Sequence, residues 1–180
     1  MLYYYVTICL IVINVAVFLM IRSGKLYAEA LTMSYHIVFN RGQYHRILTS
    51  AFAHEDPIHL LMNMISLYNV GSFVELYFGH FWMAVIYFAS MIGGKLLSLY
   101  IRHANHDDYS SSLGASGAIS GLLGAYFFVI LRYYGFGGFE HLLRPIISLV
   151  LISSIPGVDG TSHFCCMAVG LVITWLIHMF

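Results

Sequence analysis

The sequence has little charge, few prolines and few cysteines. Only 9% of its 180 residues are charged, eight basic and eight acidic, whereas soluble domains carry about 25% charged residues. This deficit argues against a water-soluble globule, and the zero net charge leaves no basic surface for nucleic acid. The three cysteines, Cys9, Cys165 and Cys166, lie in apolar stretches and lack the spacing of a disulfide framework or a zinc site.

What the sequence does have is long apolar runs. Hydrophobic residues make up 60% of the chain, and they run continuously instead of alternating as in a membrane barrel. A membrane-spanning helix needs about 20 mostly apolar residues. We therefore predict an all-α, polytopic membrane protein with six spans, at residues 2–21, 57–77, 81–101, 113–131, 142–155 and 163–180.

We predict one domain over residues 1–180, in which residues 23–56 form a long, partly interfacial loop. The first span lacks a cleavage site and is interpreted as a retained helix. Six of the eight basic residues fall on the side where this span ends, which favours the cytoplasm for that side. The chain shows no organelle-type presequence, so the simplest expectation is a multi-pass protein of a bacterial inner membrane.

Polar residues within spans are costly in lipid and therefore mark candidate functional positions. His59 and Asn63 are four residues apart and share one helix face. Ser116 lies in the fourth span and His163 begins the sixth. Small residues on these two spans predict close helix packing, namely Gly114, Gly117, Gly121 and Gly124 on the fourth and Cys166 and Gly170 on the sixth.

Close packing of the fourth and sixth spans would bring the Ser116 hydroxyl near the His163 imidazole. Such a pair is the minimal nucleophile and general base for attack on a carbonyl. His59, Asn63 and the backbone N–H of Ser116 are candidate donors for the oxyanion that this attack creates. The pattern therefore indicates a serine hydrolase within the membrane.

The same residues resemble the rhomboid intramembrane serine proteases. HLLMN at residues 59–63 matches the family's HxxxN motif, and GASG at residues 114–117 matches GxSG. His163 matches the histidine of the sixth helix. Three further positions agree with the family: Arg46 in the loop, His54 beside the second helix, and Glu75 near the end of that helix.

The resemblance implies a six-helix bundle with a sunken catalytic pair that opens to the extracytoplasmic side, opposite to the orientation that the basic residues favour. It implies that Ser116 is the nucleophile and His163 the base. His59 and Asn63 would bind the oxyanion, and Gly114 and Gly117 would leave room for the substrate backbone. Structural support would come from Arg46, His54, Glu75, Gly121 and Gly170. Neither a cofactor nor a metal is needed, and the partners would be transmembrane protein substrates in the lipid bilayer.

Four positions depart from the family pattern. His45 replaces a tryptophan before Arg46, and Ser120 replaces an aromatic residue four positions after the nucleophile. On the sixth span Ser162 stands where alanine precedes the histidine, and Cys166 stands where glycine follows it. We expect these changes to affect the level of activity and the substrate preference.

Other interpretations stay open at this stage. Asp159 is either a third catalytic residue that orients His163 or part of a turn, and Ser116 alone is also a typical helix-packing residue. The segment HEDPIH at residues 54–59 places its histidines about 140° apart on a helix, which disfavours a zinc protease. The chain as a whole is alternatively a catalytically silent rhomboid-like protein that binds membrane clients, or a small transporter or channel whose polar residues line a solute path.

Overall fold

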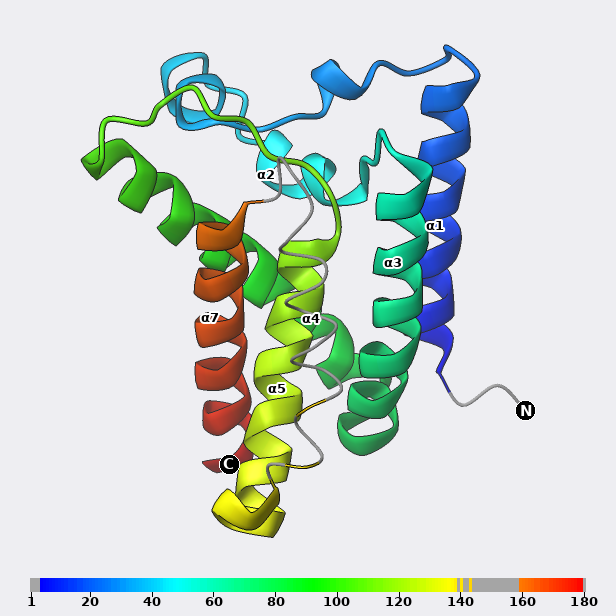
Figure 1. The fold of residues 1–180 in the computed structure, drawn as a ribbon, viewed down its shortest axis with the longest axis vertical. Helices are drawn as coiled ribbons and strands as arrows, with labels where there is room; N and C mark the ends of the chain where they lie inside the picture. Colours follow the sequence, from blue (N-terminus) through cyan, green and yellow to red (C-terminus); the bar gives the residue numbers. More distant parts are fainter. Residues whose placement is uncertain (1–3, 139, 141–142, 144–158, 180) are drawn as a thin grey trace.

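The computed structural model describes residues 4–138, 140, 143 and 159–179, and apart from one isolated bridge between Met33 and Ser112 their regular secondary structure is helical (Figure 1). Four helical stretches in these residues are long and apolar enough to cross a membrane: 5–22, 57–104, 116–134 and 160–179. The protein is therefore an all-α, multi-pass membrane protein, as predicted. The predicted span at 142–155 lies, apart from residue 143, outside the described residues.

The first helix, α1 (Tyr5–Arg22), starts against a carboxylate from another part of the chain. Its first turn receives no cap from its own sequence. Instead, Glu75 accepts hydrogen bonds from the N–H groups of Val6 and Thr7, each at 2.8 Å, and from the Thr7 hydroxyl at 2.6 Å. These N–H groups belong to the helix end that has no intrahelical partners. Glu75 thus stabilises the start of α1 and joins it to α4.

The second and third spans form one helical stretch that is interrupted at a glycine. α3 (Pro57–Ser66) begins after Asp56, whose side chain caps it, and continues through the π-helix η4 (Leu67–Gly71) into α4 (Ser72–Ala104). Within α4, Gly79 has φ +82°, a left-handed conformation that glycine adopts without steric cost. The chain reverses there, so that α3 and the main part of α4 cross the bundle in opposite directions (Figure 1).

The helices that carry the predicted nucleophile and base begin at residues other than the predicted ones. α5 (Ser116–Tyr134), followed by η5 (Gly135–Gly138), starts three residues later than the predicted span. α7 (Gly160–Met179) starts three residues earlier. Gly114 has φ +109°, which a right-handed helix excludes, and this delays α5 until Ser116.

α4, α5 and α7 pack with almost no space between their backbones. A Cβ added at Gly170 would overlap the carbonyl oxygen of Gly121, and one added at Gly94 would overlap the Cα of Cys166. The close packing predicted for the fourth and sixth spans is therefore confirmed. It places the first turns of α5 and α7 side by side at one end of the bundle (Figure 1).

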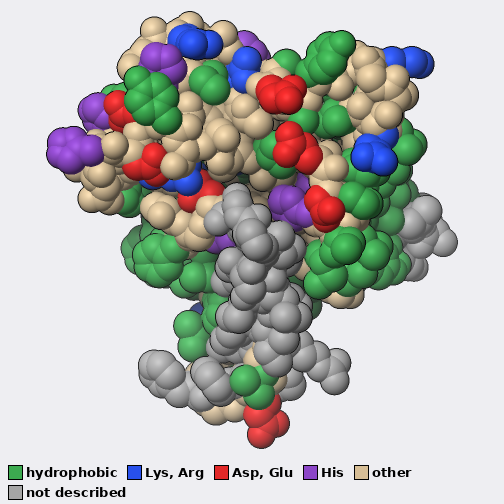
Figure 2. All heavy atoms as spheres, turned by 45° about the horizontal axis from the view of Figure 1, so that its top comes forward, with side chains coloured by type: hydrophobic (Ala, Val, Ile, Leu, Met, Phe, Trp, Pro, Cys, Tyr) green, Lys and Arg blue, Asp and Glu red, His purple; other side chains and the backbone are tan. Residues whose placement is uncertain are grey.

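The loop at residues 23–56 contains four short helical segments: η1 (Ala28–Ala30), η2 (His36–Asn40), α2 (Arg46–Thr49) and η3 (Ser50–Phe52). Arg46 joins two parts of it, because its Nη1 donates to the carbonyl oxygens of Glu29 and Thr32 at 2.8 and 2.9 Å. Most of the charged and histidine side chains visible in Figure 2 gather over the end of the bundle that carries this loop.

Candidate active site

Ser116 and His163 meet where α5 and α7 begin. The Ser116 Oγ lies 2.7 Å from His163 Nε2, within hydrogen-bond distance, and both residues are buried. The hydroxyl donates and Nε2 accepts when the ring proton is on Nδ1, which is the tautomer that a general base requires. As the first residue of α5, Ser116 also has a backbone N–H without an intrahelical acceptor.

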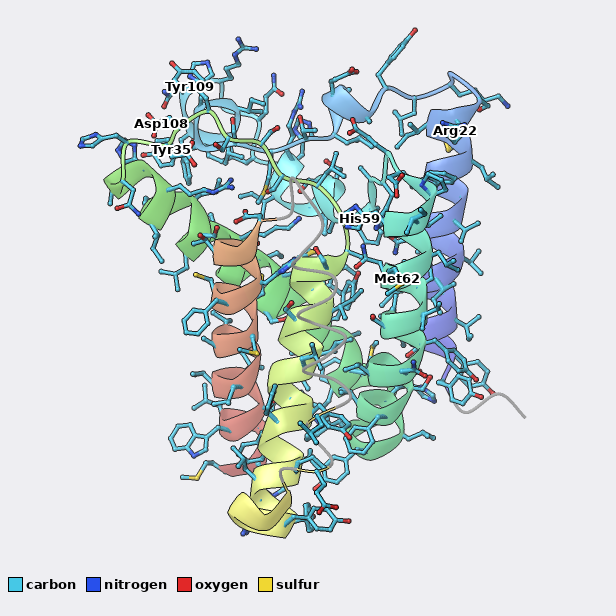
Figure 3. The ribbon with its side chains drawn as sticks, viewed as in Figure 1. Arg22, Tyr35, His59, Met62, Asp108 and Tyr109 are labelled. Carbon is cyan, nitrogen blue, oxygen red and sulfur yellow. The ribbon has the colours of Figure 1, made fainter. Side chains whose placement is uncertain are left out.

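His59 lies beside the loop that leads to the nucleophile. Figure 3 shows it on α3 near the start of α5. A Cβ added at Gly114 would lie 3.0 Å from His59 Cε1 and 3.3 Å from Nε2. Among the residues that the structure describes, the buried Nε2 has no hydrogen-bond partner. His59 therefore offers a free ring nitrogen next to the backbone that precedes Ser116.

Asn63 lies one turn after His59 along α3, but the hydrogens of its side-chain amide are engaged. Its Nδ2 donates to the carbonyl oxygen of His59 at 3.1 Å and lies 3.2 Å from His54 Nε2. In this arrangement an oxyanion would have to displace one of these two bonds to receive a hydrogen bond from Asn63. His59 is therefore the more direct side-chain donor of the two.

His54 supports this arrangement as an acceptor. Burial lowers the pKa of His54 to about 3, so the ring is neutral at physiological pH. Its Nε2 faces the amide of Asn63, and the N–H of Ala115 also points to it across 3.4 Å. His54 thus links α3 to the residue directly before Ser116.

Asp159 is the N-cap of α7. Its Oδ1 accepts a 3.0 Å hydrogen bond from the N–H of Ser162 and lies 3.4 Å from Nη2 of Arg102. Its backbone oxygen accepts the N–H of His163 at 3.1 Å. These contacts orient the first turn of α7, and with it the base, through the backbone.

A small cavity adjoins the pair. Its described lining includes Ser116 and His163 together with Lys95, Ser112, Leu113, Gly114, Gly117, Asp159 and Ser162. The free volume is about 10 Å³, close to the minimum that one water molecule occupies. A peptide therefore needs a more open site than this one.

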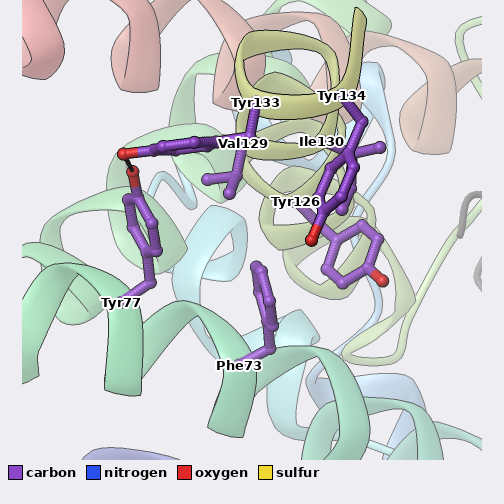
Figure 4. A pocket seen from close by; sticks show the side chains of 7 residues that line it. All are labelled: Phe73, Tyr77, Tyr126, Val129, Ile130, Tyr133 and Tyr134. Carbon is purple, nitrogen blue, oxygen red and sulfur yellow. Dashed lines mark hydrogen bonds between the residues drawn. The ribbon is translucent and has the colours of Figure 1, made fainter. Parts of the chain in front are cut away.

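A second, larger cavity lies at the opposite end of α5 (Figure 4). Its volume is about 530 Å³ and its described lining is mostly aromatic, contributed by α4 and α5. The hydroxyl of Tyr77 donates to that of Tyr133 at 2.7 Å across it. None of the described residues that line it is a serine, cysteine or histidine, whereas Ser116 and His163 line the smaller cavity.

The remaining predicted residues surround the pair at greater distance. A Cβ at Gly117 would lie 3.3 Å from the sulfur of Cys166, and one added at Gly170 would overlap the backbone of Gly121, so α5 and α7 are in close contact there. Ser120, which replaces the family's aromatic residue, donates to the carbonyl oxygen of Ser116 at 2.8 Å. Across the described part of the chain, no group of three or more histidine, cysteine or acidic side chains is arranged to hold a metal ion.

One residue of the site was missed by the sequence analysis. Lys95 lies within α4, is only 3% exposed, and lines the same cavity as Ser116 and His163. In the sequence it counted only as a basic residue for orientation. Its position in the middle of an apolar span was the signal that marks a functional candidate.

The arrangement as a whole can support acyl transfer. It provides a hydroxyl paired with an imidazole, and next to them a free ring nitrogen and a backbone N–H suited to a developing negative charge.

Comparison with known proteins finds relatives in one family. Residues 41–180 match the family model of the Rhomboid domain. The chain is 32% identical over 139 residues to RHOMBOID-like protein 4 of Arabidopsis thaliana, covering 73% of this chain and 34% of that protein. It is 31% identical over 146 residues to RHOMBOID-like protein 7 of the same plant, covering 78% of this chain and 45% of that protein.

A bacterial protein is similar to the same extent. The chain is 32% identical over 127 residues to the Rhomboid protease GluP of Bacillus subtilis (strain 168), covering 68% of this chain and 24% of that protein. The chain thus spans less than half the length of each of these three relatives.

Proposed function

The chain belongs to the rhomboid family, and we propose that it is an intramembrane serine endopeptidase that cleaves the transmembrane segments of other membrane proteins. The observation that carries the proposal is the 2.7 Å contact between Ser116 Oγ and His163 Nε2 at adjoining helix ends. The similarity to a bacterial rhomboid protease supports the same activity.

In the first half of the reaction, Ser116 Oγ attacks the scissile carbonyl carbon while its proton passes to His163 Nε2. The carbonyl oxygen becomes an oxyanion, to which the Ser116 N–H and the His59 ring donate hydrogen bonds. Each such donor typically contributes about 2.7–4 kcal/mol to the transition state. When the intermediate collapses, the C–N bond breaks and His163 returns the proton to the leaving amine.

In the second half, a water molecule attacks the acyl-enzyme. His163 removes a proton from this water, the ester bond to Ser116 breaks, and the proton returns to the serine oxygen. Water must therefore reach a site whose free volume is close to that of one molecule. We expect substrates with helix-destabilising residues to be cleaved preferentially, because a scissile peptide has to leave its helical hydrogen bonds to fit between Ser116 and His59.

The test is cleavage of a fluorescently labelled single-span substrate in liposomes by four purified proteins: wild type, Ser116→Ala, His163→Ala and Ser120→Ala. Ser120 is the matched control, because it is a buried serine one turn further along α5. We expect Ser116→Ala to cleave at background rate and His163→Ala to lose about 10²–10⁴-fold. Ser120→Ala should keep most of the activity.

A fluorophosphonate probe gives an independent reading of nucleophile activation. It should label wild type and Ser120→Ala at Ser116, and neither of the other two variants. Equal cleavage by wild type and Ser116→Ala would refute the proposal. Absence of both labelling and cleavage, with transmembrane clients still bound, would instead identify a silent rhomboid-like protein.

A further inference from the structure

Lys95 is a cation buried inside the bundle. Its side chain lies on α4 and is 3% exposed. Removing an ammonium group from water costs several kcal/mol unless polar partners surround it. Lys95 has such partners, because its Nζ donates to the Ser50 hydroxyl at 2.7 Å and to the carbonyl oxygen of Ile47 at 3.3 Å. It therefore joins α4 to the α2 and η3 segments of the long loop.

Ser50 is in turn bonded to the loop that carries the nucleophile. Its backbone oxygen accepts a 2.8 Å hydrogen bond from the N–H of Gly114, two residues before Ser116. Ser50 is fully buried, so no water competes for these bonds. A continuous path thus runs from Lys95 Nζ through the side chain and backbone of Ser50 to Gly114.

The position of Gly114 decides where Ser116 lies. Its φ of +109° sets the direction in which the chain enters α5, and α5 begins two residues later with Ser116 itself. The stem of Lys95 also lies close to this turn, since its Cε is 4.0 Å from a Cβ added at Gly117. A displacement of Gly114 would therefore change the contact between Ser116 and His163.

We propose that Lys95 is a positioning residue for the nucleophile: through Ser50 it holds Gly114, and so keeps Ser116 Oγ against His163 Nε2. This inference rests on the proposed peptidase function for its kinetic consequences. Lys95 acts through Ser50 and the backbone, and none of its described contacts is to the hydroxyl of Ser116.

The kinetic experiment compares Lys95→Met, Ser50→Ala, the double variant and Ser98→Ala in liposomes. Lys95→Met keeps the length of the stem and removes the donor. Ser98 is the matched control, because it lies one turn further along α4 and is buried with a hydroxyl that has no partner among the described residues. Since misplacement of a reacting group by about 1 Å can cost 10²-fold, we expect kcat to fall by about 10- to 100-fold in Lys95→Met, with KM within about twofold.

The double variant separates positioning through Ser50 from any other role. If Lys95 acts through Ser50, the double variant should be no slower than the slower single variant, because both changes interrupt one path. Independent, multiplying losses would overturn the inference. A rise in KM with unchanged kcat, or a loss of kcat equal to the loss of folded protein, would also overturn it.

Amide hydrogen exchange tests the same inference without catalysis. In Ser116→Ala protein, adding Lys95→Met should speed exchange of residues 113–116 by about tenfold, as expected for one weakened buried hydrogen bond, whereas Ser98→Ala should not. Unchanged exchange in Lys95→Met would overturn the positioning role whatever the activity. Faster exchange in a protein whose wild type cleaves nothing would refute the peptidase function alone.

Discussion

Replacing Glu75 by glutamine should destabilise the bundle without touching the candidate active site. The Glu75 carboxylate is 1% exposed and accepts four hydrogen bonds: from the N–H groups of Val6 and Thr7, from the Thr7 hydroxyl, and from His80 Nδ1 at 2.6 Å. Glutamine replaces one of the two accepting oxygens by an NH₂ group. Whichever way the amide turns, at least one N–H of α1 then faces another donor.

The size of the loss follows from these bonds. A buried N–H left without an acceptor costs about 1–3 kcal/mol. The two bonds to the remaining oxygen, and the bond that the new NH₂ group donates to the Thr7 hydroxyl or to His80 Nδ1, lose charge assistance and are weaker by about 1 kcal/mol each. Burial of a neutral glutamine costs less desolvation free energy than burial of a carboxylate, and this difference offsets several kcal/mol of the sum. We therefore expect Glu75→Gln to lower the free energy of unfolding by about 2–4 kcal/mol.

The measurement is equilibrium unfolding in mixed micelles, followed by tryptophan fluorescence. His80→Ala is the control, because it removes only one of the four bonds and the His80 side chain is 51% exposed; its loss should stay within about 1 kcal/mol. If Glu75→Gln unfolds at the same denaturant concentration as wild type, the carboxylate does not stabilise the start of α1 and the reasoning is wrong.

Two further predictions concern packing and pH. Gly170→Ala should lower the free energy of unfolding by about 1–3 kcal/mol and slow fluorophosphonate labelling, because the added Cβ would overlap the Gly121 backbone. Gly160→Ala should do neither, because the space around its added Cβ is open. Equal stability of the two variants would contradict the tight contact. The pKa of His54 is lowered from 6.5 to about 3 by burial, so between these pH values the unfolded chain binds more protons and stability falls as pH falls, by at most about 1.4 kcal/mol per pH unit. The free energy of unfolding, measured from pH 7 to pH 4, should therefore fall less steeply for His54→Gln than for wild type. An equal slope for these two proteins would contradict the burial of a neutral ring. His45→Gln is the control, because His45 is exposed.

The membrane-spanning character and the candidate residues were predictable because they depend on local composition. Continuous apolar runs predict helices in lipid whatever the tertiary contacts. The costly polar residues within those runs indicated Ser116 and His163 from the sequence alone. The helix boundaries were less predictable: α5 starts only at Ser116 because Gly114 adopts a left-handed conformation, and the hydropathy of the residues around it carries no sign of that.

Other features depended on contacts between segments far apart in the chain. The spacing predicted that Asn63 lies beside His59 on one helix face. It did not predict that the amide hydrogens of Asn63 are engaged by His54 and by the backbone. It presented Lys95 as one basic residue among eight, whereas the fold turns its ammonium group toward Ser50. Partners separated by 45 residues in the sequence leave no local pattern, so no reading of α4 alone identifies them.

The amino-acid sequence by itself determined that this protein lies in a membrane as a helical bundle, and it marked a serine and a histidine as the candidates for chemistry. Only the tertiary structure decided that these two side chains lie 2.7 Å apart, because their distance depends on how closely α5 and α7 approach at Gly121 and Gly170. Composition sets which solvent a segment prefers, while the relative position of two helices comes from the shapes of both surfaces in contact.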